Sequence, residues 1–270
     1  MDYQTFQPHP DLSALVKFYW TLEVPYDPNN EKQKIIPDGC IEMTFNLKDS
    51  IKRYTSETDY VIHPNSMVMG QRTKSYFIEP VGDVDSFAIC FYPYGFANFV
   101  GTPLEKLVDV ETPIEQLFGE DVASTLKQRM FQANGTQERI EIIEAFLLEK
   151  LNENSTVEHL VKTTVDALLA TDGSSSITQI LKDDLSKRRQ LERNFKKQIG
   201  ISPKQLGKVL RLQAALKRML NDQESLTNVA YESDYFDQAH FIKDFKEFIG
   251  TTPKEFLENE SMALSTLFYK

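Results

Sequence analysis

The sequence predicts an α+β protein, with an N-terminal β-rich barrel or sandwich, a helical connector and an all-α C-terminal domain. A series of short β-branched and aromatic segments, each bounded by turn residues, predicts the first part. An internal repeat with helical spacing and a local excess of basic residues predict the last part. The expected division is residues 1–110, 111–170 and 171–260.

The N-terminal region contains short strand-like segments separated by Pro, Gly, Asn and Asp. A short helix is expected over Pro10–Val16, and Pro37-Asp38-Gly39 is a turn that connects two strands. The expected strands are Phe18–Val24, Lys34–Ile36, Ile41–Leu47, Tyr60–Ile62, Ser66–Met69, Tyr76–Glu79 and Asp85–Tyr92. Short strands at this spacing indicate a small sandwich or barrel.

Helical spacing begins after Pro93-Tyr94-Gly95 and continues to about residue 170. Helical segments are expected over Phe96–Val100 and Leu104–Val108, and another helix is expected to start after Thr112-Pro113. Three longer helical stretches are expected around Leu126, Ile143 and Val161, and they are separated by breaks at Asn134–Thr136 and Asn152–Ser155. Two roles stay open for these helices: packing on the β-rich region, or forming an interface between two copies of the chain. Thr171–Ser176 is a linker by composition.

The segment from Leu191 to Leu206 recurs with a shift of about fifty residues, from Phe241 to Phe256. In both copies apolar residues stand at i, i+4 and i+8, a Gly follows directly, and a hydroxyl residue followed by Pro starts another helix. In the first copy these residues are Leu191, Phe195, Ile199, Gly200, Ser202 and Pro203. In the second copy they are Phe241, Phe245, Ile249, Gly250, Thr252 and Pro253. A shorter apolar-periodic segment precedes each copy. Short helix, tight turn and longer helix make a helix-turn-helix, so a double helix-turn-helix domain is predicted.

Charge is distributed unevenly over this repeat. The chain has a net charge of −10, yet Leu185–Leu220 holds eleven basic residues against Glu192, which gives about +10. Asn221–Glu260 holds three Lys against ten acids, which gives about −7. A local basic patch of this kind meets the phosphates of a nucleic acid. The first unit is therefore expected to bind phosphate more strongly than the second.

The repeat resembles the DNA-binding domain of the AraC/XylS family of bacterial transcription regulators. The resemblance covers about eighty residues and is most specific in Val229-Ala230, Tyr235–Phe241, Phe245-Lys246 and Gly250-x-Thr-Pro253. Upstream, Ile36-Pro-Asp-Gly-Cys-Ile-Glu42 and Gly70-Gln-Arg-Thr73 are similar to an uncharacterised N-terminal domain of the same family, and this similarity implies no ligand. The family resemblance implies double-stranded DNA as a partner and a sensor domain ahead of the DNA-binding domain.

The longer helix of each unit would lie in the major groove and present its polar face there. The family position implies Arg189, Glu192 and Arg193 as base readers in the first unit, and the outward face of the second unit adds Gln238, Ala239, Ile242 and Lys243. The expected phosphate contacts are Lys187, Arg188, Lys196, Lys197, His240 and Lys246, and Asp237 is the expected N-cap. The alternative for each residue is an exposed side chain that is only solvated.

Both turns depart from the family pattern. In the first, Asp184-Leu185-Ser186 stands in place of the usual Gly or Asn followed by an apolar residue, so Leu185 is expected to fill the apolar position one residue early. This shift leaves Ser186 or Lys187 as the start of the recognition helix. In the second, Asp234 replaces the usual Gly, and Asp tolerates the left-handed region.

Signals for catalysis are weak, and no enzyme activity, cofactor or metal is expected. The four His residues share no metal-ligand spacing, and neither a phosphate-binding Gly loop nor a nucleophile elbow is present. Cys40 and Cys90 are expected to be buried structural residues, with an exposed reactive Cys40 as the alternative. Trp20 and Glu42 are guessed as ligand contacts in a pocket.

The sequence as a whole indicates a transcription regulator. A cytoplasmic location is expected, because no apolar run has the length of a membrane span and the N-terminus lacks the features of a signal peptide. A small-molecule effector at the N-terminal domain and a homodimer are open partners. The first alternative is a small-molecule β-barrel enzyme with a degenerate DNA-binding tail. The second is a protein-interaction module whose acidic second unit meets an RNA polymerase subunit. Activation and repression are both open.

Overall fold

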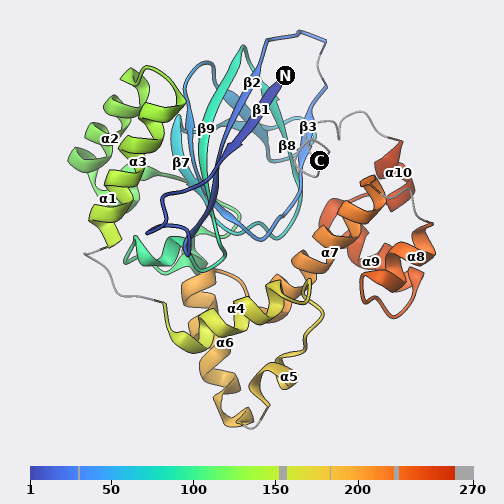
Figure 1. Ribbon diagram of the computed structural model, residues 1–270. Helices are drawn as coiled ribbons and strands as arrows, with labels where there is room; N and C mark the ends of the chain where they lie inside the picture. The colour runs from blue at the N-terminus through green and yellow to red at the C-terminus, as the bar shows by residue number, and fades with distance from the viewer. Residues whose placement is uncertain (30, 152–156, 183, 222–224, 259–270) are drawn as a thin grey trace.

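The computed structural model describes residues 1–29, 31–151, 157–182, 184–221 and 225–258. Two sheets form the N-terminal part, helices α1 to α3 lie beside one of them, and helices α4 to α10 form the C-terminal part (Figure 1). The strands are β1 (Asp2–Phe6), β2 (Val16–Val24), β3 (Gln33–Ile35), β4 (Ile41–Asn46), β5 (Ile51–Tyr54), β6 (Tyr60–Ile62), β7 (Ser66–Met69), β8 (Tyr76–Pro80), β9 (Val84–Phe91) and β10 (Glu111–Pro113).

The helices fall into two groups in the chain. The first group is η1 (Phe96–Asn98) and η2 (Leu104–Leu107), which are 3-10 helices, followed by α1 (Ile114–Phe118), α2 (Glu120–Gln132) and α3 (Thr136–Leu151). The second group is α4 (His159–Leu169), α5 (Ile177–Leu181), the 3-10 helix η3 (Leu185–Lys187), α6 (Arg188–Ile199), α7 (Pro203–Asn221), α8 (Leu226–Glu232), α9 (Gln238–Ile249) and α10 (Pro253–Leu257). Among the described residues, no helix combines the length and the apolar character needed to cross a membrane.

The larger sheet is antiparallel throughout, in the order β1-β2-β9-β4-β7-β10. Side chains alternate between its two faces, as they do in any strand. In β9, Phe87, Ile89 and Phe91 pack in the same core as Ile143 and Leu147 of α3. Helices α2 and α3 therefore cover this face of the sheet (Figure 1), which is the first of the two roles that the sequence left open for them.

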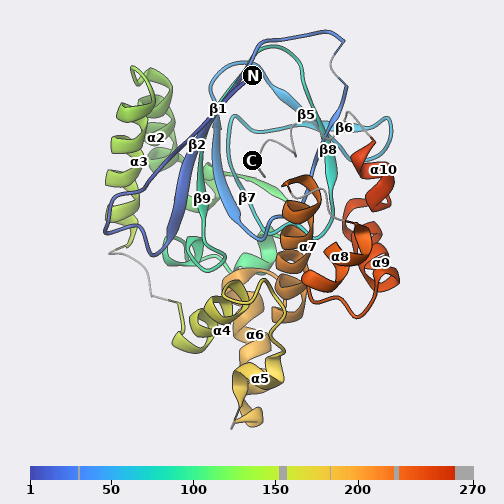
Figure 2. The same ribbon diagram turned by 45° about the vertical axis from the view of Figure 1, so that its right-hand side comes forward.

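The opposite face of the larger sheet meets the smaller sheet, whose order is β3-β8-β5-β6. Ala88 and Cys90 of β9 point to this side, where they cluster with Trp20 and Cys40 and with Ile78 of β8. Over the described residues the strands make two open sheets, so a closed barrel is wrong and two facing sheets are observed (Figure 2).

The expected strands are confirmed with small shifts at their ends. The short helix expected over Pro10–Val16 is wrong: the segment is a series of turns, and Val16 is already the first residue of β2. Its backbone bonds close short loops, such as Leu12 N to His9 O at 2.9 Å. Strands β1, β5 and β10 were missed because they are short and contain few β-branched residues in alternation. The break expected at Asn152–Ser155 lies outside the described residues, except that α3 ends at Leu151.

Helix α7 is the centre of the C-terminal part, with α4 to α6 at one end and α8 to α10 at the other (Figure 2). Leu206 of α7 packs with α4 to α6 around Phe195, and Leu216 packs with α8 to α10 around Phe245. The segment expected to be a linker is held in place here, because a Cβ on Gly173 would lie 2.0 Å from the carbonyl oxygen of Gly207. Glycine is required for this approach of the backbone to α7.

Candidate nucleic-acid interface

The first helix-turn-helix unit consists of α5, η3 and α6. Ser176 caps α5 because its Oγ accepts a hydrogen bond from Gln179 N, while Gln179 Oε1 accepts one from Ser176 N, so that the helix start is fixed. The turn contains Lys182 at φ 39, and α6 ends at Gly200, which has φ 102. The predicted Gly stop is confirmed.

Helix α6 buries one face and exposes the other. Leu191, Phe195 and Ile199 are buried against Val165 and Leu168 of α4, so the apolar face predicted from the sequence is confirmed. The expectation for Leu185 is wrong: this side chain is 54% exposed. Leu181, at the end of α5, is the buried apolar residue of this region. Because η3 occupies 185–187, α6 begins at Arg188, one residue after the latest expected start.

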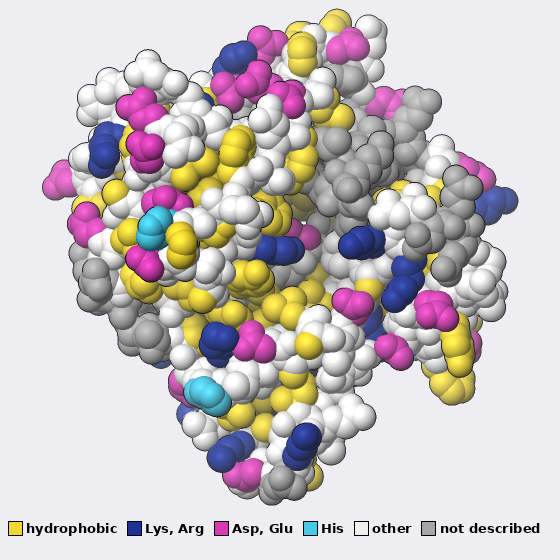
Figure 3. Space-filling view, in the orientation of Figure 1, with side chains coloured by type: hydrophobic (Ala, Val, Ile, Leu, Met, Phe, Trp, Pro, Cys, Tyr) yellow, Lys and Arg dark blue, Asp and Glu magenta, His cyan; other side chains and the backbone are white. Residues whose placement is uncertain are grey.

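Every polar residue singled out in the first unit is exposed, Lys187 at the end of η3 and the others on α6. The side chains of Lys187, Arg188, Arg189, Glu192, Arg193, Lys196 and Lys197 are all exposed. Arg188 donates from Nε to Glu192 Oε1 across 3.2 Å, so these two exposed side chains are partnered with each other. Lys and Arg side chains mark this lower end of the molecule in Figure 3.

A hollow of about 740 Å³ runs beside this face. It is lined by Ser174–Thr178 before and in α5, by Arg188, Arg189, Glu192, Arg193 and Lys196 of α6, and by Lys204 and Arg211 of α7. Sequence reasoning counted Lys204 and Arg211 in the basic patch but did not place them beside α6. The hollow therefore gathers basic groups from two helices, which suits an anionic backbone.

The second unit consists of α8, a turn and α9. Asp237 caps α9 by accepting from His240 N at 2.7 Å, and Asp234 takes φ 55 in the turn, so both expectations are confirmed. Helix α9 ends at Gly250 with φ 85, and Thr252 caps α10. Phe241, Phe245 and Ile249 form the buried face.

The outward face of α9 is less open than that of α6. Ala239, Lys243 and Lys246 are exposed, whereas Gln238, His240 and Ile242 are half-buried. The side-chain oxygen of Gln238 accepts a hydrogen bond from Thr227 Oγ1 at 3.0 Å. Ile242 packs on the core of the unit, and His240 lies edge-on to Tyr235. Only part of this face is free to touch a groove without rearrangement.

One buried polar residue joins each of α6 and α9 to the long helix that precedes its unit, which is α4 for α6 and α7 for α9. Asn194 of α6 donates to both carboxylate oxygens of Glu158, at 2.8 and 2.7 Å. Fifty residues later, Asp244 of α9 accepts from Lys208 Nζ of α7 at 3.1 Å. Both pairs are separated by 36 residues, so the repeat includes α4 and α7 as well as the helix-turn-helix segments. The signal was present in the sequence as polar residues at repeat-related positions on apolar faces.

The β-rich part contacts α7 through the turn between β3 and β4. Gln213 donates from Nε2 to Pro37 O across 2.5 Å, and Gln71 Nε2 donates to Gly39 O at 2.7 Å. A Cβ on Gly39 would lie 3.3 Å from Leu206 and 3.6 Å from Val209. The two N-terminal motifs found in the sequence, which include Gly39 and Gln71, thus meet at the surface of α7.

The C-terminal ends of both recognition helices also touch the β-rich part. Ile249 O of α9 accepts from Lys34 Nζ at 2.8 Å and from Ser75 Oγ at 2.9 Å. A Cβ on Gly200, which ends α6, would lie 3.2 Å from Leu104 O. Cationic and hydroxyl donors at the last carbonyls of a helix stabilise its C-terminus. The region before α1 therefore contacts the C-terminal end of both α6 and α9, and at α9 it supplies hydrogen-bond donors.

Trp20 and Glu42, the guessed ligand contacts, lie together between the two sheets. Trp20 donates from Nε1 to Glu42 Oε1 at 2.9 Å. Burial, with a smaller contribution from the charge of Asp38, raises the pKa of Glu42 to about 8. A carboxyl group in this setting stays protonated at neutral pH. Their role in binding a ligand stays a prediction.

Two large apolar side chains of the second unit are exposed and were missed. Phe236 is 91% and Tyr231 79% exposed, and they flank the turn before α9. A usable signal was present, because neither residue belongs to the apolar period of α8 or α9.

Comparison with known proteins accounts for both parts of the chain. Residues 186–259 match the model of a helix-turn-helix domain, and residues 4–113 match a domain of unknown function, DUF6597. A relative from Haemophilus influenzae, described as an uncharacterized HTH-type transcriptional regulator, is 32% identical over 75 residues. This match spans 28% of the chain and about a quarter (25%) of the relative.

Solved structures of ToxT from Vibrio cholerae have a similar arrangement. One is 11% identical, covers 89% of this chain and 98% of its own, and has a TM-score of 0.49. Another, bound to (E)-4-(8-methylnaphthalen-1-yl)but-3-enoic acid, is 12% identical, covers 96% and 99%, and has a TM-score of 0.48. Residues 186–259 are an AraC-type helix-turn-helix domain, which is a DNA-binding module of transcription regulators, and they follow a DUF6597 domain at residues 4–113.

Proposed function

We propose that this protein regulates transcription by reading two adjacent major-groove segments with α6 and α9, under the control of its N-terminal part. The observation that supports this most is the repeated unit itself. In both copies one helix buries an apolar face, exposes a polar face and is tied to the preceding long helix through one buried polar side chain, Asn194 or Asp244. Two such units joined by α7 suit successive turns on one side of a duplex.

Helix α6 supplies the stronger readout in this proposal. Arg189 and Arg193 present guanidinium groups that bond guanine bidentately, and Glu192 accepts from the N4 amino group of cytosine. Lys187, Arg188, Lys196 and Lys197 bind flanking phosphates, because all four are exposed and Arg188 and Lys196 also line the hollow of α5 to α7. Arg188 and Glu192 exchange their mutual contact for DNA contacts on binding.

Helix α9 makes fewer contacts. Gln238 reads adenine after leaving Thr227, Lys243 binds guanine or a phosphate, and Ala239 and Ile242 touch a thymine methyl group. His240 and Lys246 bind phosphate. The acidic surroundings of this unit, with a charge of about −7 over 221–260, place most of the affinity in the first unit.

Control by the N-terminal part acts through the contacts with α7 and with the ends of α6 and α9. Movement of the turn at Pro37–Gly39 is transmitted to α7 by the bond from Gln213, and loss of the contact between Lys34 and Ile249 frees the end of α9. An effector bound between the sheets would change both. The functional division is 1–110 for sensing, 111–170 as connector and 171–260 for DNA.

A second role for the second unit is supported by Phe236 and Tyr231. Exposed aromatic side chains next to an acidic surface suit a protein partner such as an RNA polymerase subunit. In this case the first unit holds DNA and the second unit holds both DNA and the partner.

Selection of bound sites from random DNA by the full chain tests the proposal. Two conserved half-sites separated by about one helical turn, 10–10.5 base pairs, are expected. Footprinting of the selected site should show protection on one face of the duplex. A single half-site, unaffected by changes in α9, would contradict reading by both units, and absence of any selected sequence would overturn the proposal.

A further inference from the structure

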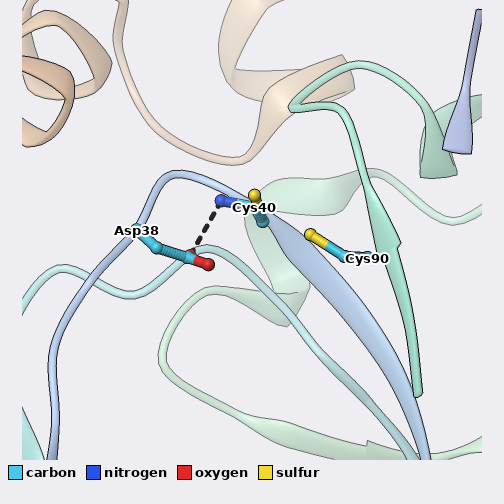
Figure 4. Close-up of side chains that lie close together, drawn as sticks. All are labelled: Asp38, Cys40 and Cys90. Atoms are coloured by element: carbon cyan, nitrogen blue, oxygen red, sulfur yellow. Dashed lines mark hydrogen bonds between the residues drawn. The ribbon is translucent and has the colours of Figure 1, made fainter. Parts of the chain in front are cut away.

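Three side chains with metal-binding atoms converge between the two sheets. The sulfur atoms of Cys40 and Cys90 and a carboxylate oxygen of Asp38 all lie within 4.8 Å of one another. Asp38 belongs to the turn before β4, Cys40 directly precedes β4, and Cys90 is in β9. Figure 4 shows the Cys90 sulfur and the Asp38 carboxylate directed toward Cys40. Sequence spacing could not reveal the group, because fifty residues separate the two cysteines.

The strand register explains why the cysteines meet. Glu42 of β4 stands opposite Cys90 of β9, and Cys40 is two residues earlier on the same face, so the two cysteines are diagonal neighbours. Diagonal neighbours in an antiparallel pair have Cα atoms about 7–8 Å apart. A disulfide needs Cα atoms within about 6.8 Å, so a disulfide here would require backbone movement. The pair is better placed to share a third atom than to bond directly.

Asp38 is already oriented as a ligand. Its Oδ1 accepts a hydrogen bond from Cys40 N at 2.9 Å, which fixes the carboxylate and leaves Oδ2 for another partner. Both cysteines are buried, whereas Asp38 is exposed, so the group has one open side. Donors on the outer oxygen of a ligating carboxylate hold it in place in metal sites.

We propose that Asp38, Cys40 and Cys90 bind a divalent thiophilic metal ion of the Zn²⁺ class, with a fourth position open to water or to an added ligand. Zn²⁺ takes Cys and carboxylate ligands in tetrahedral geometry. At a Zn–S distance of about 2.3 Å, neighbouring ligand atoms lie roughly 3.8 Å apart. The three atoms reach this spacing by small side-chain rotations. On binding, each thiol releases its proton to solvent.

The local charges match a divalent ion. Two thiolates, one carboxylate and a divalent ion leave one negative charge, and the Lys17 ammonium is the neighbouring cation. Lys17 lies close enough to both sulfur atoms for their charge, that of Cys40 above all, to raise its pKa. The exposed Lys17 would offset the remaining negative charge from outside the ligand group.

The site also lies directly under the contact with α7. Asp38 and Cys40 flank Gly39, whose carbonyl accepts from Gln71 and whose Cα faces Leu206 of α7. A metal ion that draws Asp38 and Cys40 toward Cys90 shifts this turn, and through Gln213 it shifts α7. This step rests on the proposed function, whereas metal binding itself does not.

Metal titration of the full chain tests the site. Reduced, chelator-treated protein is titrated with Co²⁺ and then with Zn²⁺, with thiolate-to-cobalt charge-transfer absorption and ion count as readouts. One ion per chain and an absorption band that Zn²⁺ removes are expected. Asp38→Asn should weaken binding by more than about tenfold, the lower bound for losing even an outer-sphere partner. Glu23→Gln, an exposed carboxylate of the same sheet, is the matched control.

Cys40→Ser and Cys90→Ser should abolish the charge-transfer band, and circular dichroism shows whether each variant is folded. Asp38→Asn keeps the proposal testable if a Cys variant does not fold. No Co²⁺ or Zn²⁺ bound, or binding that Asp38→Asn leaves unchanged, would overturn the site. Rapid conversion of both thiols to a disulfide by a hydroperoxide, without metal binding, would overturn it in favour of a redox pair. Metal binding that leaves DNA affinity unchanged supports the site and overturns only its link to α7.

Discussion

Lys208 and Asp244 join α7 to α9 through a contact of 3.1 Å between Nζ and Oδ1, and Asp244 is only 3% exposed. His240 Nε2 lies 3.7 Å from the other carboxylate oxygen. The position of the second recognition helix on α7 therefore depends on a buried charge and its partner. A buried ion that loses its partner is costly, because its desolvation is no longer offset.

Lys208→Met should accordingly lower the free energy of unfolding by about 3 kcal/mol. DNA binding should weaken as well, through misplacement of α9. Denaturant unfolding followed by circular dichroism measures the first effect. Lys217→Met, an exposed lysine of the same helix, is the control and should change stability by less than about 0.5 kcal/mol. Equal effects of the two variants would show that the buried pair does not hold α9.

Arg193→Ala should cost roughly 1–3 kcal/mol of DNA binding and relax preference at one base pair. The reason is the loss of a guanidinium that reads a base edge in our proposal. Mobility-shift titrations against the selected site and against single-base variants measure the change. Uniform weakening across all sequences would instead identify Arg193 as a phosphate contact.

Lys197→Ala should leave base preference intact and reduce the slope of log affinity against log salt by about one. Its ammonium is exposed at the far end of α6, where in our proposal it meets the DNA backbone rather than a base. Titrations at two or more salt concentrations give the slope. If the slope stays the same as that of the unchanged protein, Lys197 does not neutralise a phosphate.

His63 should make stability depend on pH between about 4 and 6.5. Burial lowers its pKa from 6.5 to about 4, so in this window the unfolded chain takes up a proton that the folded chain does not. The contribution is fully present above pH 6.5 and is lost as the pH falls, by roughly 3 kcal/mol at pH 4. His63→Gln should remove this part of the pH dependence. Unfolding midpoints of both proteins, measured across this pH window, test the prediction. If the two curves of midpoint against pH run parallel, His63 does not cause the pH dependence.

Gly39→Ala should destabilise the protein by about 1–2 kcal/mol, because Gly39 has φ 80 and an L-residue is strained there. The new Cβ would also press on Leu206 of α7 at 3.3 Å. Gly101→Ala is the control, since nothing lies within 4 Å of a Cβ at that position. Thermal unfolding compares the two variants, and similar melting temperatures would remove the claim that the turn is constrained.

Local signals predicted much of the fold. The strand segments, the two Gly stops and the Asp237 cap follow from residue type and short-range spacing, and all are present. The expectation that Leu185 fills the apolar position of the turn was wrong, because the turn around Lys182 has a backbone geometry that residue type does not reveal. The prediction of a helix over Pro10–Val16 was wrong, because a few apolar residues at helical spacing do not distinguish a helix from successive turns.

Long-range relationships were not predictable from one sequence. The pairing of Cys40 with Cys90 depends on which strands are neighbours, and the bond from Lys34 to Ile249 depends on how the two parts of the chain dock. The exposed residues of α6 could be named from the repeat, whereas the engagement of Gln238 by Thr227 required the folded second unit. Single-sequence periodicity reports on one element at a time, and these contacts join elements far apart.

The equal spacing of Glu158 with Asn194 and of Lys208 with Asp244 bears on how the protein can be divided. A recombinant fragment that starts at Thr171 would leave Phe195 without α4 and would expose an apolar surface to water. A fragment that starts before Glu158 keeps α4 with α5 and α6, as it keeps α7 with α8 and α9. The smallest piece of this chain worth expressing for DNA work therefore begins ahead of α4.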